Sequence, residues 1–295
     1  MENLVNSILR KHWNLSAPIK ADDTGASRMT WQVGKDHWIT RTNISDVDQF
    51  KSETKLISRL SNELQLKKTP FKTLETITSM ENLEIVIDQG YAWRITKNIA
   101  GVKLPASDKR TYFTLIKTIF DLHKAFGEIS ISEATIKDSL VDKLNMLEKD
   151  FFKESRLLND IMSFIKPHLK ELSQNDKQIT HGDFNPSNII YSINGESIKV
   201  EAIIDLECCR PDPPIMDYAQ LFIMAICHSG DKNPFKITED ILGVIGKKYS
   251  RMSLHACMMA YWIDLYLNLH HIPVAKEKVL LRLSQLWSFH TKYGS

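Results

Sequence analysis

The stretch ITHGDFNPSNIIY, residues 179–191, decides the fold that we predict for this chain. It places three chemically capable residues, His181, Asp183 and Asn188, around a proline turn between apolar flanks. The next apolar run, AIIDLE, delivers Asp205 at its end. If the two runs pair as a hairpin, Asn188 and Asp205 lie at neighbouring strand ends, where their oxygens suit Mg²⁺ that is also bound by phosphate and water. The two runs therefore predict a metal and phosphate site.

Composition and charge limit the class of protein. The 295 residues are 43% hydrophobic and 25% charged, which is typical of a globular chain with one large domain or two lobes. The formal net charge is only +2, so we expect neither nucleic acid nor a membrane surface as a partner. The four cysteines form no C-x-x-C motif, and the start, MENLVNSILRKHWN, lacks the features of a signal peptide, so we expect a cytoplasmic protein.

Hydrophobic periodicity divides the chain into two parts. Residues 30–99 form short β-rich runs around one helical segment, FKSETKLISRL, with turns expected at residues 34–36 and 89–90. Beyond residue 101, apolar residues recur at every third or fourth position, as in amphipathic helices. We therefore predict an α+β fold with a small β-rich N-terminal lobe, residues 1–99, and a larger, mainly helical C-terminal lobe, residues 100–295.

Three motifs give the chain a family resemblance. HGDFNPSNII, IIDLE and PIMDYAQL resemble the H-G-D-x-x-x-x-N, I-D-x-[EDG] and D-x-A motifs of the aminoglycoside phosphotransferase and choline kinase-like family. The likeness runs from about Asp23 to Ala225. It implies a bilobal protein-kinase-like fold, as a monomer or homodimer. It also implies a phosphotransferase that uses ATP or GTP with Mg²⁺ to phosphorylate a hydroxyl of a small molecule, such as an antibiotic, a sugar or an amino alcohol.

The resemblance assigns roles to individual residues. Asp183 matches the catalytic base, and Asn188 and Asp205 match the Mg²⁺ ligands. A loose phosphoryl-transfer transition state mainly requires positioning and charge neutralisation, which such groups supply. Arg41 stands where the family has a Lys or Arg that holds the α- and β-phosphates, and Glu53 is its expected ion-pair partner on the following helix.

Further residues complete the nucleotide site that the resemblance implies. The adenine is expected to bind backbone groups between Lys97 and Ile99. The phosphate loop contains only Gly25 and lacks a G-x-G-x-x-G or Walker A motif, so Ser27 and neighbouring amides are the expected phosphate contacts. Glu207 either reaches the metal or remains a solvated or hydrogen-bonded side chain.

Other polar residues have structural interpretations. We expect His181 to brace the loop by hydrogen bonds, and Asp217 to cap its helix or to fix the catalytic loop. For Asp183 taken alone, the alternative to catalysis is an Asx-turn or cap before Pro186. The methionine and aromatic stripe within residues 258–266 is typical of core packing rather than of a ligand site.

Two hypotheses about function remain open at this point. One is the small-molecule phosphotransferase, and the alternative is a catalytically silent kinase-like module that binds a nucleotide or a partner. A silent member usually loses a catalytic or metal residue, whereas Asp183, Asn188 and Asp205 are all present. From residue 225 onward the chain has nine Lys or Arg and five Asp or Glu, so we predict an acceptor that is not a polycation.

Overall fold

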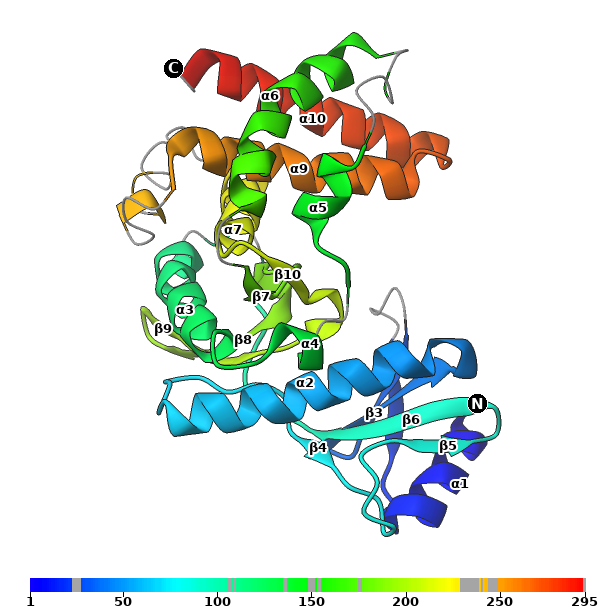
Figure 1. Cartoon of the computed structure of the whole chain (residues 1–295). Helices are drawn as coiled ribbons and strands as arrows, with labels where there is room; N and C mark the ends of the chain where they lie inside the picture. The colour runs from blue at the N-terminus through cyan, green and yellow to red at the C-terminus, as the bar shows by residue number, and fades with distance from the viewer. Residues whose placement is uncertain are drawn as a thin grey trace. The chain divides into compact units, whose positions relative to one another are not determined.

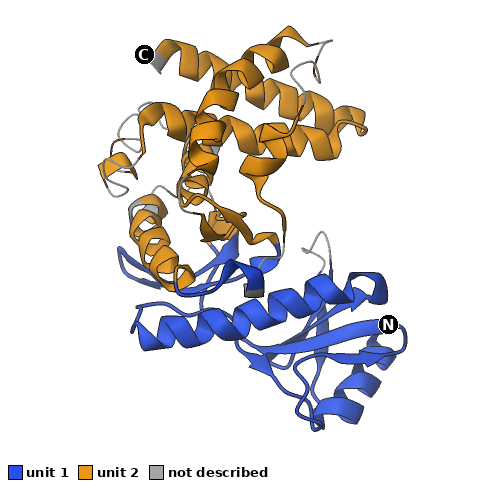
Figure 2. Cartoon of the chain, viewed as in Figure 1, with its two compact units in different colours: residues 1–103, 128–136, 188–207 blue, residues 104–127, 137–187, 208–295 orange. Residues whose placement is uncertain are grey.

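The structure is a computed structural model that describes residues 1–22, 28–105, 108, 110–134, 137–147, 152, 155–174, 177–228, 239, 241–243 and 249–293. Contacts divide the chain into two compact units, which Figure 2 shows in different colours. Unit 1 contains residues 1–103, 128–136 and 188–207, and unit 2 contains residues 104–127, 137–187 and 208–295. Because unit 1 also includes two segments from later in the chain, this division does not test the predicted lobe boundary between residues 99 and 100. That boundary stays a prediction.

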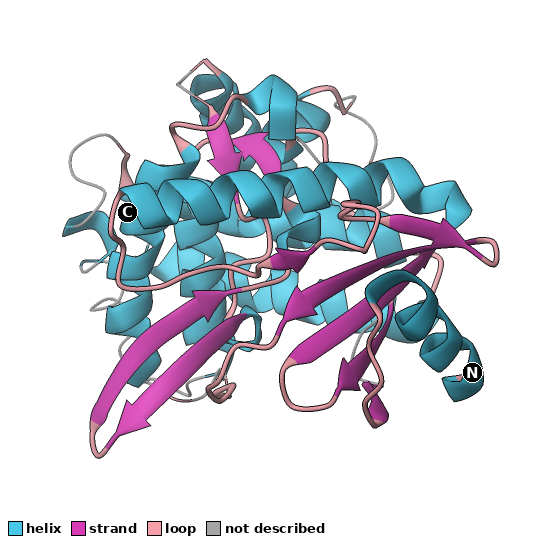
Figure 3. Cartoon of the chain, turned by 90° about the horizontal axis from the view of Figure 1, so that it is seen from below, coloured by secondary structure: helices cyan, strands magenta, loops and turns pink. Residues whose placement is uncertain are grey.

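Unit 1 is built on an antiparallel sheet (Figure 1; Figure 3). Its described strands pair in the order β1-β2-β3-β6-β4, and β5 also pairs with β6. The two predicted turns are confirmed: Gly34, with φ 58°, joins β2 to β3, and Gln89 and Gly90, with φ 53° and 77°, join β5 to β6. The strands are β1 (Ile19–Asp22), β2 (Met29–Val33), β3 (His37–Asn43), β4 (Thr76–Ile77), β5 (Val86–Asp88) and β6 (Tyr91–Lys97).

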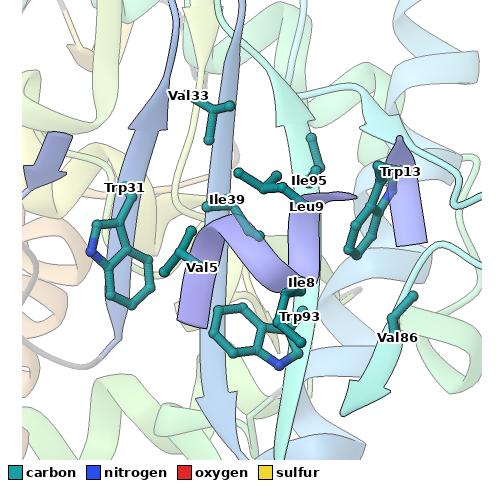
Figure 4. Close-up of a cluster of buried hydrophobic side chains, with 10 residues drawn as sticks. All are labelled: Val5, Ile8, Leu9, Trp13, Trp31, Val33, Ile39, Val86, Trp93 and Ile95. Carbon is teal, nitrogen blue, oxygen red and sulfur yellow. The ribbon is translucent and has the colours of Figure 1, made fainter. Parts of the chain in front are cut away.

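Helix α1 (Glu2–Trp13) covers one face of this sheet (Figure 4). The helix has apolar residues three and four positions apart, so they fall on one side of it. This stripe and the apolar residues of the sheet form one buried cluster, composed of Val5, Ile8, Leu9, Trp13, Trp31, Val33, Ile39, Val86, Trp93 and Ile95. Helix α1 has no counterpart among the elements predicted from the sequence.

Helix α2 (Val47–Leu66) covers the other face, and it confirms the helix predicted between the strands. Glu53 and Thr54 of α2 both bond to Arg94 of β6. Arg94 lies between Trp93 and Ile95, which belong to the cluster beneath α1. Because successive side chains of a strand point to opposite faces, Arg94 points away from α1 and toward α2.

The β-hairpin that connects the first two sequence motifs, HGDFNPSNII and IIDLE, also belongs to unit 1. The predicted hairpin is confirmed: β8 (Ile189–Asn194) and β9 (Ser197–Ile203) pair antiparallel, and Ile189 lies opposite Ile203. Isolated β-bridges join Val102 to Tyr191 of β8 and Lys72 to Ala202 of β9. Backbone hydrogen bonds therefore attach both strands of the hairpin to other parts of the unit. A Cβ at Gly101 would lie 2.7 Å from the carbonyl oxygen of Tyr191, which explains glycine at this close approach.

Unit 2 is mainly helical (Figure 1), so the predicted α+β division into a sheet-rich part and a helical part is confirmed. A short antiparallel pair, β7 (Gln178–Thr180) and β10 (Arg210–Asp212), lies beside the segment that carries the first motif, residues 181–187 (the catalytic segment). None of the helices within the described ranges is long and apolar enough to cross a membrane. The helices of unit 2 are α3 (Arg110–Phe126), α5 (Leu140–Asn145), α6 (Arg156–Ser173), α7 (Ile215–His228), α9 (Arg251–Leu269) and α10 (Pro273–Tyr293); the short α4 (Ile131–Ala134) belongs to unit 1.

Candidate active site

The open end of the β8–β9 hairpin brings together the two predicted metal ligands. The carbonyl of Asn188 accepts a hydrogen bond of 2.9 Å from the amide of Ile204, so Asn188 is linked to the residue that precedes Asp205. Asp205 has a φ of 64°, a left-handed conformation that Asp tolerates better than most residues. The predicted proximity of Asn188 and Asp205 is therefore confirmed, and their role as ligands stays a prediction.

This pair of oxygen donors fits one kind of metal. Among the described residues, no group of three His, Cys, Asp or Glu side chains could form a closed metal cage. Mg²⁺ needs no such cage, because it binds one or two protein oxygens and completes its shell with phosphate and water. Asn188 and Asp205 are suitable for an Mg²⁺ that arrives with a nucleotide.

A cavity of about 330 Å³ lies within unit 1 beside this pair. It is lined by Asp205, by the predicted adenine contacts Lys97 and Ile99, and by side chains from the α2 face of the sheet, such as Thr40. Its volume is within the range of small-molecule sites. Predicted residues from two distant parts of the sequence thus line one cavity, while Gly25 and Ser27 lie outside the described residues.

Glu53 is buried at the centre of a charged cluster. One carboxylate oxygen accepts a hydrogen bond of 2.8 Å from Nη2 of Arg94, and the other accepts from Nη1 of Arg28. Burial alone would raise the pKa of Glu53, but the charges of Arg94 and Arg28 and their hydrogen bonds outweigh it and hold the pKa below its ordinary value. Glu53 is therefore ionised and paired with two arginines.

Arg41 lies on the opposite face from the one expected. Its guanidinium carbon is 4.0 Å from the ring centre of Tyr91, and Nη1 and Nη2 donate to the sulfur atoms of Met1 and Met29. Its neighbour Thr40 lines the cavity, and alternation along β3 turns Arg41 the other way. The predicted Arg41–Glu53 ion pair is therefore wrong.

Asp217 fixes the catalytic segment of unit 2, as predicted. It is fully buried and accepts hydrogen bonds from the amides of His181 and Gly182 at 2.9 and 3.0 Å. Its Oδ2 also lies 2.9 Å from Nε2 of His123 on α3. Burial would raise the pKa of Asp217, but the hydrogen bond and charge of His123, the charge of His181 and the amide bonds hold the pKa below its usual value. The buried carboxylate of Asp217 is thus stabilised by the same backbone amides that it holds in place.

The rest of the segment is equally restrained. Gln220 of α7 donates to the carbonyl of Gly182 at 3.1 Å and accepts from the amide of Phe184. Gly182 has a φ of 75°, and a Cβ there would lie 2.0 Å from the carbonyl oxygen of Cys208. The buried His181 accepts a 3.3 Å bond from the amide of Asp183 at Nδ1, which confirms its predicted bracing role.

Asn185 orients the carboxylate of Asp183. Its Nδ2 donates to Oδ1 of Asp183 at 3.0 Å, while its Oδ1 accepts from the amide of Ser187 at 2.9 Å. Asn185 therefore makes an Asx-turn around Pro186. The bond from Asn185 thus restrains the carboxylate of Asp183, whose role as the catalytic base stays a prediction.

Asp183 lines a second cavity, of about 230 Å³, within unit 2. Polar and apolar side chains from one face of α7 and one face of α9 form its walls. Met258 and Met259 are buried core residues as predicted, whereas Tyr261 and Trp262 of the same stripe also line the cavity, so for these two the choice between core and ligand site stays open. The lining residues are Asp183, Asn185, Gln220, Ile223, Met224, Tyr261, Trp262, Asp264, Leu265 and Asn268.

We predict that Asp217→Ala lowers the free energy of unfolding by about 3–5 kcal/mol, because it removes one partner from a buried charged network. Urea titration followed by circular dichroism would measure this loss. Asp160→Asn is the matched control, since Asp160 is half exposed and pairs only weakly with Arg156 at 3.8 Å; this change should stay within about 0.5 kcal/mol. Equal effects of the two substitutions would contradict the role given to Asp217.

Unit 2 thus carries a restrained acidic segment beside one cavity, and unit 1 carries the oxygen donors Asn188 and Asp205 at a hairpin end beside another. Comparison with protein families matches residues 19–255 to the phosphotransferase enzyme family APH. The chain belongs to this family, and it is a small-molecule kinase. No curated protein sequence matches it.

Solved structures share the fold at low sequence identity. Wild-type aminoglycoside 2'-phosphotransferase-IIIa in its GDP complex is 11% identical, with a TM-score of 0.66 over 98% of this chain and 99% of that chain. The amicoumacin kinase hAmiN, in complex with AMP-PNP, Ca²⁺ and Ami, is 11% identical, with a TM-score of 0.64 over 97% and 92%. The macrolide 2'-phosphotransferase MphH from Brachybacterium faecium is 10% identical, with a TM-score of 0.62 over 95% and 97%. These similarities confirm the predicted fold.

Several site residues were not found from the sequence. Arg28 and Arg94 contact Glu53 from 25 and 41 positions away, and neither belongs to a recognisable motif. Gln220 follows Asp217 by one helical turn, so the spacing of residues on one helix face could have indicated it. His123 lies in the last turn of α3, and its contact with Asp217 depends on how α3 and α7 pack.

Proposed function

We propose that this kinase transfers the γ-phosphate of ATP or GTP to a hydroxyl of a small molecule that is not a polycation. Asp183 is the base, and Asn188 and Asp205 hold Mg²⁺. The observation that carries the proposal is the position of Asp205, which lines the unit 1 cavity and follows the residue bonded to Asn188. Mg²⁺ would supply charge neutralisation for the phosphates there.

The nucleotide base is assigned to the unit 1 cavity near Ile99. The amide of Lys97 already donates to the carbonyl of Glu75 at 2.9 Å, and the amide of Asn98 donates to the carbonyl of Asp36 at 2.7 Å. We therefore assign the base edge to the amide of Ile99, the next donor along the chain. Leucine, isoleucine and tryptophan side chains in the cavity lining suit a flat aromatic base.

Asp183 is assigned to the acceptor hydroxyl. A carboxylate that lines a cavity can orient a bound hydroxyl and accept its proton as the phosphoryl group is transferred. The bond from Asn185 to Oδ1 leaves Asp183 in one orientation, and such positioning is the main requirement of a loose transition state.

The charges of the unit 2 cavity support an acceptor with few positive charges. Among the described residues that line this cavity, the only carboxylate besides Asp183 is that of Asp264. Asp264 is already paired with Lys143 at 2.6 Å and lies 3.8 Å from Arg210, so its charge is compensated. The lining also contains apolar residues of both helices. A polycation would need more unpaired carboxylates than these to replace its hydration.

An acceptor screen tests this proposal. Release of ADP or GDP would be measured with amino alcohols, sugars, nucleosides, neutral antibiotics with free hydroxyls and kanamycin-like polycations. We expect turnover with a neutral, zwitterionic or singly charged hydroxyl compound, and weaker turnover with polycations. Preferred turnover of polycations would contradict the acceptor class, and failure to bind either nucleotide would contradict the enzymatic proposal as a whole.

A further inference from the structure

Arg28 links two acidic side chains within unit 1. Its Nη1 donates to Glu53 of α2, and its Nε lies 3.7 Å from Oε2 of Glu207. Glu53 is a buried residue of the helix, whereas Glu207 is only two positions beyond Asp205. Arg28 therefore connects the helix to the segment that carries the predicted metal ligand.

The charges of this cluster are not balanced by Glu53 alone. Arg28 and Arg94 both bond to the single carboxylate of Glu53, and their guanidinium carbons lie 4.9 and 4.5 Å from the ring centre of Phe50. Counting only these described side chains, two cations and one anion leave a net charge of +1 in a largely buried setting. Because burying an unbalanced charge is costly, a further anion should accompany the cluster. In this structure that anion is Glu207.

The position of the pair relates it to the nucleotide cavity. Asp22 and Thr30, on either side of Arg28 in the chain, both line the cavity, and so does Asp205. The side chain of Glu207 is 23% exposed, and its contact with Arg28 is longer than a hydrogen bond. A phosphate group can therefore compete with Glu207, since it offers charge-assisted bonds to the planar guanidinium.

We propose that Arg28 is the phosphate-binding cation of the nucleotide site and that Glu207 occupies it when no nucleotide is bound. This inference rests on the proposed function, because it requires a nucleotide in the unit 1 cavity. It gives Arg28 the role that the sequence assigned to Arg41, whose side chain lies on the α1 face. Arg94 then keeps Glu53 paired when Arg28 turns to phosphate.

Calorimetric binding of ATP and GTP, each compared with its own nucleoside, separates phosphate recognition from base recognition. Arg28→Gln should weaken triphosphate binding about 10- to 100-fold, as expected for loss of charge-assisted bonds, and change nucleoside binding less than about twofold. Arg41→Gln is the matched control and should leave the ratio of triphosphate to nucleoside affinity unchanged. Equal weakening of nucleoside and triphosphate by Arg28→Gln, or the same selective loss in Arg41→Gln, would overturn the proposal.

Glu207→Gln provides a second and independent measurement. In the absence of Mg²⁺ it should tighten triphosphate binding about two- to fivefold, because it removes the group that competes for Arg28. The gain should vanish in the Arg28→Gln background; a gain that persists there would overturn the competition. If Arg28→Gln does not fold, Arg28→Lys keeps the charge opposite Glu53 and should lose only part of the triphosphate affinity. Wild-type protein that binds neither triphosphate would instead overturn the proposed function, and this inference with it.

Discussion

Asp183→Asn is expected to lower kcat by about 10²- to 10⁴-fold, the contribution of a positioned general base. The substitution removes the negative charge and the proton-accepting ability of the side chain while retaining its shape. The segment should remain in place, because Asp217 and Gln220 hold it through backbone groups that the substitution does not alter. Steady-state kinetics with an acceptor from the screen would measure the loss.

The binding of nucleotide separates a chemical effect from a folding effect in this variant. The affinity for ATP or GTP should change less than about twofold, since only the proton acceptor is removed, and the thermal melt should resemble that of wild type. Asp160→Asn again serves as the matched control and should retain full turnover. Unchanged kcat in Asp183→Asn would contradict the role of Asp183 as the base.

Asp205→Asn is expected to abolish most of the Mg²⁺-dependent part of nucleotide binding. Asparagine tolerates the left-handed backbone at this position as aspartate does, so the variant tests the charge of the ligand without adding backbone strain. Loss of the negative charge of this ligand should weaken metal-dependent affinity at least about tenfold, given that even outer-shell changes reach this size. Turnover should fall by a comparable or larger factor.

A thermal melt with and without Mg²⁺ measures this effect. At a nucleotide concentration of about 100 times Kd, wild type should gain about 2.7 kcal/mol, and a variant that binds tenfold more weakly only about 1.4 kcal/mol. Asp22→Asn is a useful comparison, because Asp22 lines the same cavity but belongs to β1 and not to the β8–β9 hairpin. Equal Mg²⁺-dependent gains in wild type and Asp205→Asn would contradict the metal assignment.

Features that depend on local sequence were predicted well. The β8–β9 hairpin follows from two apolar runs separated by a short turn, and its register alone brings Asn188 and Asp205 to one end. The turns at Gly34 and Gly90 follow from the ability of glycine to adopt positive φ. Asp217 as the residue that fixes the catalytic segment also follows from its position in the first turn of α7.

Features that depend on distant packing were missed. Alternate side chains of β3 point to opposite faces of the sheet, with Trp38 and Thr40 on one face and Ile39 and Arg41 on the other. Each face therefore carries a large side chain. The pattern alone does not say which face carries the nucleotide; α1 decides this by covering the face of Ile39. The partners of Glu53 could not be predicted for the same reason, since they come from β6 and from the residue before β2.

The central claim is that the chain phosphorylates a small-molecule hydroxyl with Asp183 as base. Mass spectrometry of the acceptor after incubation with Mg²⁺ and ATP or GTP tests it most directly, with wild type and Asp183→Asn at equal concentration. We expect one added phosphoryl group per acceptor with wild type and almost none with the variant in the same time. Equal phosphorylation by both proteins, or an acceptor left unmodified by wild type while nucleotide is bound, would contradict it.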